Sequence, residues 1–216
     1  ESFVSNIRHH LGDSLSKIIF VNNSPELIVN KYDDVEIYNL EANLGYGSAI
    51  NHAFKYVNSG FILIMNPDNR LEKFNVDLSI LKENIYTGIR DNVREFEFFP
   101  SLFHDFLQYI SFKTFGFCRE LILKLKPKVK VTTNIHPIYW VYGDFMLMNV
   151  NVFVSVNGFD DSFFMFYEEV DFCRRARRKD YLCYSLLTVK YNSISSKSSS
   201  VNVDKIKVKS EFNSFV

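Results

Sequence analysis

The chain has 216 residues, and its 25 basic and 25 acidic side chains give a formal net charge of zero. This balance provides no general attraction to nucleic acid, so no nucleic-acid partner is expected. The composition is 47% hydrophobic and 16% aromatic, which excludes an intrinsically disordered chain. Chains of this length commonly fold around one core, and we expect a single domain across residues 1–216.

The cysteines and the apolar runs indicate the cellular compartment of the protein. Cys118, Cys173 and Cys183 form no C-x-x-C pair, which predicts reduced thiols rather than disulfides or a thiolate zinc site. No apolar run reaches the roughly 20 residues that span a bilayer, and residues 1–12 lack the apolar core of a signal peptide. We therefore expect a soluble, cytoplasmic protein.

The N-terminal part follows the order of an α/β fold. Apolar, β-branched runs predict strands at residues 17–22, 35–40 and 61–65. A glycine-bearing loop after the second strand leads into a helix that is predicted to begin at Ser48. Strand, loop, helix and strand in this order favour a mostly parallel sheet flanked by helices.

The remaining elements are predicted from shorter patterns. Residues 112–130 carry lysines between apolar side chains, which favours a packed helix, with a membrane-touching segment as the alternative. Further helices are predicted at 71–85, 149–158 and 168–179, and further strands at 139–148 and 182–191. Gly158 is expected at the C-terminal end of its helix.

Two loops at predicted strand ends carry polar residues. Asn66-Pro67-Asp68 follows the third strand, where a carboxylate would suit a divalent cation bound to phosphate oxygens, or would equally well cap a helix. The loop with Gly45 and Gly47 lacks the third glycine of a dinucleotide fingerprint. Close approach to a phosphate and an ordinary turn are equally compatible with this loop.

An acidic cluster lies between aromatic residues and arginines in residues 164–178. Glu168, Glu169 and Asp171 fall in the first turn of a predicted helix, where the backbone dipole favours negative charge. Partial desolvation by the neighbouring aromatic residues would raise the proton affinity of a carboxylate towards that of a general base. The alternative is a solvated helix start paired with Arg174, Arg175 and Arg178.

Four segments of the chain together resemble a known family. They are VNNS, NLGYGSAIN, ILIMNPDN and YGDFMLMNVNVFVSVNGFDDSFFMFYEEVDFCRR, at residues 21–24, 43–51, 62–69 and 142–175. In this order they resemble glycosyltransferase family 2 with the GT-A fold, in particular the rhamnosyltransferase-like branch of bacterial polysaccharide assembly. The resemblance implies an inverting transfer from a nucleotide-diphosphate sugar, with dTDP-rhamnose as the favoured donor, to a hydroxyl of a growing glycan or lipid-linked glycan.

The resemblance also implies roles for individual residues. Asp68 would bind Mg²⁺ or Mn²⁺ on the donor diphosphate, and Glu169, preceded by Glu168, would take the acceptor proton. Donor contacts are implied for Asn22, Asn23, Asn43, Gly45 and Asn51, and contacts to the sugar or acceptor for Gly143 and Asp144.

Several positions depart from the family pattern. The first strand of the family is missing, which suggests truncation at the N-terminus. Asn22 and Glu169 each replace an aspartate, Asp144 replaces a small residue, and Tyr191 replaces a late histidine that often contacts metal or phosphate. One extra methylene at Glu169 moves the carboxylate by about 1 Å, and a misplacement of that order can cost about a hundredfold in rate. These departures keep open a non-catalytic nucleotide-sugar-binding protein, and residues 121–130 keep open a membrane-associated assembly factor with peripheral contact.

Overall fold

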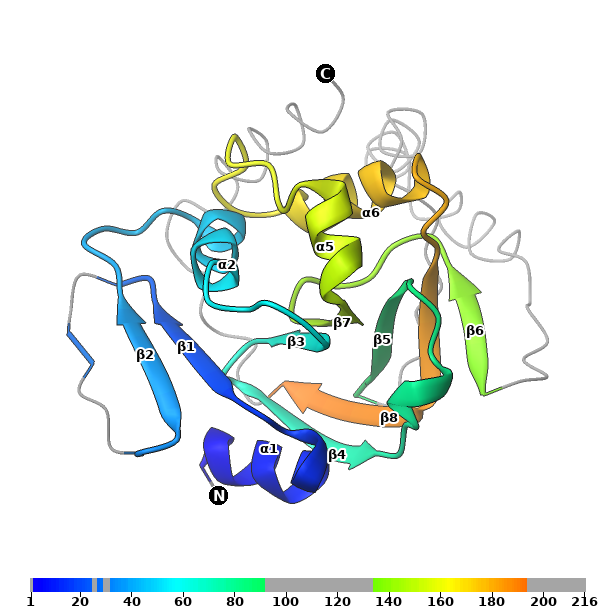
Figure 1. Cartoon of the computed structure of the whole chain (residues 1–216), viewed down its shortest axis with the longest axis horizontal. Coiled ribbons are helices and arrows are strands. Elements are labelled where there is room, and N and C mark those ends of the chain that lie inside the picture. Colours follow the sequence, from blue (N-terminus) through cyan, green and yellow to red (C-terminus); the bar gives the residue numbers. More distant parts are fainter. Residues whose placement is uncertain (1, 25–26, 29–31, 92–133, 194–216) are drawn as a thin grey trace, which may run out of the picture.

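The computed structural model describes residues 2–24, 27–28, 32–91 and 134–193 (Figure 1). The predicted helix at residues 112–130 lies outside the described residues, as does Cys118. Cys173 and Cys183 are both buried free thiols, as predicted.

The described strands form two sheets. β1 (Ile18–Asn22) and β2 (Val35–Asn39) make a two-stranded sheet. The larger sheet has the order β3-β7-β5-β8-β4, and β6 pairs with β8 beside this path. Its strands are β3 (Phe61–Met65), β4 (Asn69–Phe74), β5 (Ile85–Arg90), β6 (Ile135–Ile138), β7 (Phe145–Asn149) and β8 (Cys183–Ser193).

Strand direction is mixed. The β1–β2 and β5–β8 ladders are parallel, as in the predicted sheet. The β3–β7, β5–β7, β4–β8 and β6–β8 ladders are antiparallel. The predicted predominance of parallel pairing therefore holds for β1–β2 but not for the larger sheet, because β7 runs opposite to both of its neighbours.

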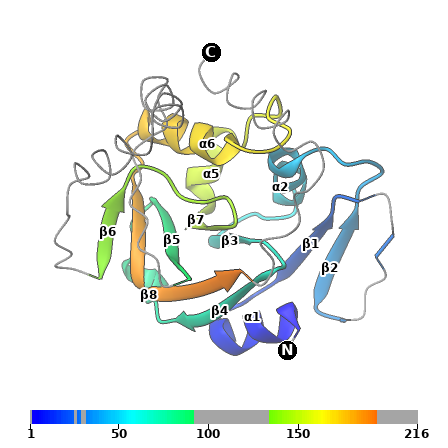
Figure 2. The same cartoon turned by 180° about the vertical axis from the view of Figure 1, so that it is seen from behind.

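Helices cover the larger sheet on two sides (Figures 1 and 2). α2 (Tyr46–Phe54), α5 (Val150–Val156) and α6 (Glu168–Arg177) lie above it in both views, and α1 (Phe3–Leu11) lies below, against β4. Two short 3₁₀ turns, Gly12–Ser14 and Leu78–Ile80, complete the described elements. The α/β class and the flanking helices agree with the prediction.

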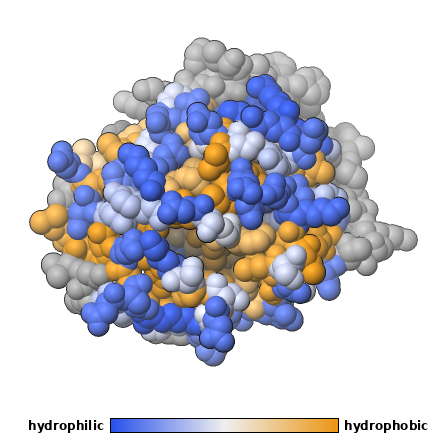
Figure 3. Space-filling view, viewed as in Figure 1, coloured by the Kyte–Doolittle hydropathy of each residue, from blue (hydrophilic) through white to orange (hydrophobic). Residues whose placement is uncertain are grey.

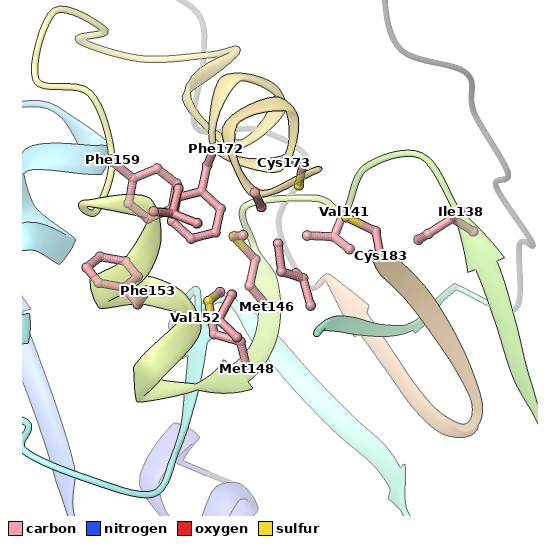
Figure 4. Packing of buried hydrophobic residues seen from close by; sticks show 13 residues of the cluster. Ile138, Val141, Met146, Met148, Val152, Phe153, Phe159, Phe172, Cys173 and Cys183 are labelled. Carbon is pink, nitrogen blue, oxygen red and sulfur yellow. The ribbon is translucent and has the colours of Figure 1, made fainter. Parts of the chain in front are cut away.

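The core has two parts, one on each side of β7. Met146 and Met148 belong to the part that includes Val152 and Phe153 of α5 and Phe172 of α6 (Figure 4). Phe145 and Leu147 belong to the other part, with Ile7 of α1 and Tyr191 of β8. Alternate side chains of a strand point to opposite faces, so a strand covered on both faces is apolar throughout.

The principal error of the sequence prediction is the helix at residues 71–85. This segment instead contains β4 and the 3₁₀ turn Leu78–Ile80. Apolar residues at 71, 74, 78 and 81 have helical spacing, but pairing with β8 at the far end of the chain decides the structure. α2 begins at Tyr46, two residues before the predicted start, and α5 ends in two left-handed residues, Asn157 and Gly158.

Candidate active site

Asparagines gather where β1 ends and α2 begins. The Asn22 amide donates to Oδ1 of Asn39 at 2.7 Å, which joins the ends of β1 and β2. The Asn23 amide donates to Oδ1 of Asn43 and to the Gly45 carbonyl, both at 3.0 Å. The structure thus brings Asn22, Asn23, Asn43 and Gly45 into one loop cluster.

Gly45 connects this loop to the segment before α6. Its φ is +88°, and a Cβ atom there would lie 2.3 Å from the carbonyl oxygen of Phe164. The next backbone amide, that of Tyr46, donates to the same carbonyl at 3.0 Å. Only glycine combines this backbone conformation with such a close approach.

Asn51 is used differently. Its side-chain amide donates to the Phe159 carbonyl at 2.8 Å, and its Oδ1 accepts from the Phe159 amide at 2.9 Å. It also donates to Asp161 at 2.9 Å. The structure therefore ties Asn51 to the loop before α6, whereas the resemblance assigned it to the donor.

Asp68 lies in the tight turn between β3 and β4. The Asn69 amide donates to the Asn66 carbonyl across the turn, and β4 begins at Asn69. No helix begins at this turn, so the alternative of Asp68 as a helix cap is wrong. Its Oδ2 accepts from Ser193 Oγ at 3.4 Å, which places the carboxylate beside the end of β8.

Asp144, just before β7, is the hub of the neighbouring contacts. Its backbone carbonyl accepts from the Asn66 amide at 3.2 Å and from the Asn69 side chain at 2.9 Å. Its carboxylate accepts from Arg90 at 3.2 Å and from the Tyr191 hydroxyl at 3.0 Å. The sequence analysis did not identify Arg90, which follows a segment with a blurred pattern.

Two residues with left-handed backbone conformation precede the two glutamates at the start of α6. Phe166 and Tyr167 both have left-handed φ angles, +69° and +67°, immediately before Glu168. Glu168 is only 5% exposed, and its Oε2 has no hydrogen-bond partner among the described residues. Left-handed conformations at such residues are costly and commonly mark functional sites.

Burial shifts the pKa values of both glutamates upward. It raises the pKa of Glu168 to about 7. It raises the pKa of Glu169 to about 8, with further contributions from the charges of Glu168 and Asp144. Asp171 instead pairs with Arg175 at 2.7 Å. Of the two alternatives, pairing with an arginine therefore applies to Asp171. Desolvation of the carboxylate applies to Glu168 and Glu169.

Tyr46 shows that these acids converge. Its hydroxyl donates to the Gly143 carbonyl, and a Cβ added at Gly143 would lie 3.2 Å from the Tyr46 ring and 3.7 Å from Cβ of Glu169. Burial raises the pKa of Tyr46 well above its usual value, and the carboxylates of Asp144, Glu168, Glu169 and Asp68 raise it further. Four acids from three separate parts of the fold are thus near enough to Tyr46 to raise its pKa.

The described residues fit a metal only in a limited way. They contain no group of three or more His, Cys, Asp or Glu side chains that could hold an ion. Asp144 is already neutralised by Arg90. Asp68 can supply one carboxylate to a metal whose other ligands are phosphate and water, which is the usual mode for Mg²⁺ on nucleotides.

A solved structure has the same fold. The structure of GalNAc-T7 with UDP, GalNAc and Mn²⁺ superimposes with a TM-score of 0.65, covering 98% of this chain and 44% of that one at 9% sequence identity. The chain accordingly has the GT-A fold, as predicted.

Sequence comparisons find similar proteins in one family. Residues 3–75 match the model of glycosyl transferase family 2. The low-salt glycan biosynthesis hexosyltransferase Agl10 of Haloferax volcanii is 25% identical over 175 residues, which are 77% of this chain and 55% of that protein. The rhamnosyltransferase WbbL of Escherichia coli K12 is 50% identical over 36 residues, 17% of this chain and 14% of that protein. These matches agree with the predicted resemblance to glycosyltransferase family 2, and the chain spans about half the length of Agl10.

One further finding concerns membranes. Among the residues that the structure describes, no helix is long and apolar enough to cross a bilayer.

Proposed function

We propose that the chain transfers a sugar, with inversion, from a nucleotide-diphosphate donor to an acceptor hydroxyl. The observation that carries this proposal is that the carboxylates of Asp68 and Glu169, from distant parts of the chain, both raise the pKa of Tyr46, whose hydroxyl bonds the Gly143 carbonyl beside Glu169. A transferase of this type needs one group at the departing diphosphate and one at the attacking hydroxyl. The family assignment supports the same reaction class.

Glu169 is proposed as the general base. The acceptor hydroxyl would donate its proton to the Glu169 carboxylate while its oxygen forms a bond to the anomeric carbon of the donor. The bond from that carbon to the diphosphate would break on the opposite face, and the nucleoside diphosphate would leave. A pKa near 8 suits the task, because a base with high proton affinity remains ionisable at neutral pH.

Asp68 is proposed to hold the diphosphate end of the donor through Mg²⁺ or Mn²⁺. The metal, when bound, would supply positive charge to the leaving diphosphate. The turn that presents Asp68 is held by the Asp144 carbonyl, so its position depends on the start of β7. Glu168 is proposed to support the base, because its buried charge raises the proton affinity of Glu169.

The remaining roles follow the loop contacts. Asn22, Asn23, Asn43 and Gly45 are proposed to border the nucleotide, and Gly143 and Asp144 to border the sugar and acceptor. Asn51 is proposed to act on the donor side indirectly, because its amide fixes the Phe159 loop against α2.

The donor and acceptor are proposed from the relatives. The name of WbbL supports rhamnose as the transferred sugar, for which dTDP-rhamnose is the proposed donor, and the name of Agl10 supports a hexose and a glycan acceptor. A bacterial polysaccharide or a lipid-linked glycan would be the acceptor, and the reaction would take place in the cytoplasm. The segment proposed for peripheral membrane contact, residues 121–130, lies outside the described residues.

The proposal is tested by incubating the protein with UDP, dTDP and GDP sugars, with Mn²⁺ or with chelator, and measuring release of the nucleoside diphosphate. We expect release from at least one donor, and its loss in Glu169→Gln with donor binding retained. Asp171→Asn is the matched control, because this neighbouring acid pairs with Arg175. Equal turnover by Glu169→Gln and the wild type would remove Glu169 from the mechanism.

A second candidate function is nucleotide-sugar binding without transfer. Two observations favour it: Asp144 is paired with Arg90, and burial raises the pKa of Glu169 to about 8, so that this carboxyl is mostly protonated near pH 7. The same assay separates the two functions. Donor binding without release of nucleoside diphosphate across the panel would support the second candidate.

A further inference from the structure

Arg90 lies at the edge of the proposed site and has no role in the mechanism above. Its Nη1 donates to Asp144 at 3.2 Å, and its guanidinium lies over the Tyr142 ring, 4.9 Å from the centroid. Its Nε is 3.7 Å from Asp91. These contacts hold one face and one edge of the guanidinium in place.

The sheet determines where this arginine stands. Arg90 ends β5 and lies opposite Tyr191 of β8 in the parallel ladder. Tyr191 donates to the second oxygen of the same Asp144 carboxylate at 3.0 Å. Asp144 and Tyr191 are two positions at which the chain departs from its family, and the structure shows that the two departures contact each other.

The cluster of contacts reaches the Asp68 turn. The Asp144 carbonyl accepts from Asn66 and Asn69, which flank Pro67 and Asp68. Ser193, two residues after Tyr191 on β8, donates to Asp68 itself. Arg90 is therefore linked through Asp144 to the turn that carries Asp68, the residue proposed to hold the donor diphosphate.

The charge and shape of the Arg90 guanidinium suit a phosphate ligand. The diphosphate of a nucleotide donor carries negative charge, and the nearby acids Asp68 and Asp144 offer it no cation of their own. A guanidinium offers a planar pair of donors that matches phosphate oxygens, and stacking on an aromatic ring holds it ready. The Arg90 side chain is 38% exposed, so part of it remains accessible to a ligand, whereas the Asp144 side chain is 15% exposed.

We propose that Arg90 binds the diphosphate of the nucleotide donor and that Asp144, Tyr142 and Tyr191 position it. This inference rests on the proposed function, and it adds a cation that belongs to the protein itself. It predicts that nucleoside diphosphates bind measurably even when divalent metal is chelated.

Calorimetry with UDP and dTDP, and with uridine and thymidine as partners that lack the diphosphate, tests the proposal. In the presence of chelator we expect Arg90→Gln to weaken nucleoside diphosphate binding by about tenfold to a hundredfold, the usual effect of losing a hydrogen bond between charged groups. Nucleoside binding should not change. Arg90→Lys keeps the charge but loses the planar pair of donors, so its affinity for nucleoside diphosphates should lie between those of the wild type and Arg90→Gln.

Arg177→Gln is the matched control. This arginine also lies over a tyrosine ring, 5.2 Å from the centroid of Tyr139, but it stands on the exposed side of α6. It should leave all four affinities unchanged.

The outcomes separate the two proposals. If the wild-type protein binds none of the nucleoside diphosphates with or without Mn²⁺, the proposed function fails. If it binds them and Arg90→Gln binds them equally well, the role of Arg90 is refuted while the proposed function stands. Equal weakening of nucleoside and nucleoside diphosphate binding by both Arg90 variants would show a structural role and would also overturn the proposal.

Discussion

Glu169→Gln should lose activity, but its stability relative to the wild type should increase as the pH rises. Burial raises the pKa of Glu169 from 4.5 to about 8, so the folded protein keeps the proton over a range in which the unfolded chain has lost it. The folded state then binds more protons than the unfolded state, and the free energy of unfolding falls as the pH rises. The contribution of the protonated group is complete below about pH 4.5 and is lost progressively up to about pH 8.

The size of the effect follows from the shift. Each pH unit within this range changes the free energy of unfolding by about 1.4 kcal/mol per group, so Glu169 contributes a loss of about 4 kcal/mol between pH 5 and pH 8. Glutamine does not titrate, so the variant lacks the pH dependence of the free energy of unfolding that comes from Glu169. The pH dependence that comes from Glu168 remains in both proteins.

Urea unfolding at pH 5, 6, 7 and 8 measures the difference. The single tryptophan, Trp140, packs against the α5–α6 side of the core and reports the transition by fluorescence. We expect the stability of Glu169→Gln relative to wild type to increase by about 4 kcal/mol from pH 5 to pH 8. A difference that stays constant over this range would show that Glu169 is not buried as described and would refute the reasoning.

Three further predictions concern the same site. The kcat/KM of the wild type should rise between about pH 6.5 and pH 9, because Glu169 must lose its proton to act as a base; initial rates that are flat over this range would contradict this role. Gly45→Ala should lower the free energy of unfolding by more than 2 kcal/mol (about 1–2 from backbone strain, plus the clash with Phe164), whereas Gly60→Ala, with the same φ of +88° but open space, should show the strain alone. Equal losses in the two variants, measured by urea unfolding, would show that the loop gives way. Asp68→Asn should weaken Mn²⁺-dependent donor binding by about tenfold or more and leave metal-free binding nearly unchanged; calorimetry that finds both unchanged would exclude Asp68 as the metal ligand.

The strands and the acidic helix start could be predicted because their signals are local. β1, β2 and β3 are short apolar runs ended by polar turns, and each lies within a residue of its predicted range. The predicted start of α6 at Glu168 is confirmed, because three acids in a first turn match the helix dipole.

The direction of the larger sheet and the convergence of the site could not be predicted in the same way. β4 depends on pairing with β8, more than a hundred residues further along the chain, and its own apolar spacing favours a helix. Arg90 carries no local motif, and Tyr46 lies in the NLGYGSAIN segment without any pattern that singles it out. Their importance follows from the contacts with Asp144 and Gly143, which only the folded chain brings about.

Figure 3 shows a hollow near the centre of this face, bordered by hydrophobic residues. All five residues of β3 are only partly buried, although the strand is apolar throughout, and β7 is its one neighbour among the described strands. A buried sheet strand of this composition is normally covered on both faces.

A crystal structure of the protein with a bound nucleoside diphosphate sugar tests the central claim most directly. The account predicts the diphosphate between Asp68 and Arg90, with the anomeric carbon of the sugar facing the Glu169 carboxylate across a space that fits one acceptor hydroxyl. A donor bound elsewhere, or bound with its sugar turned away from Glu169, would contradict it.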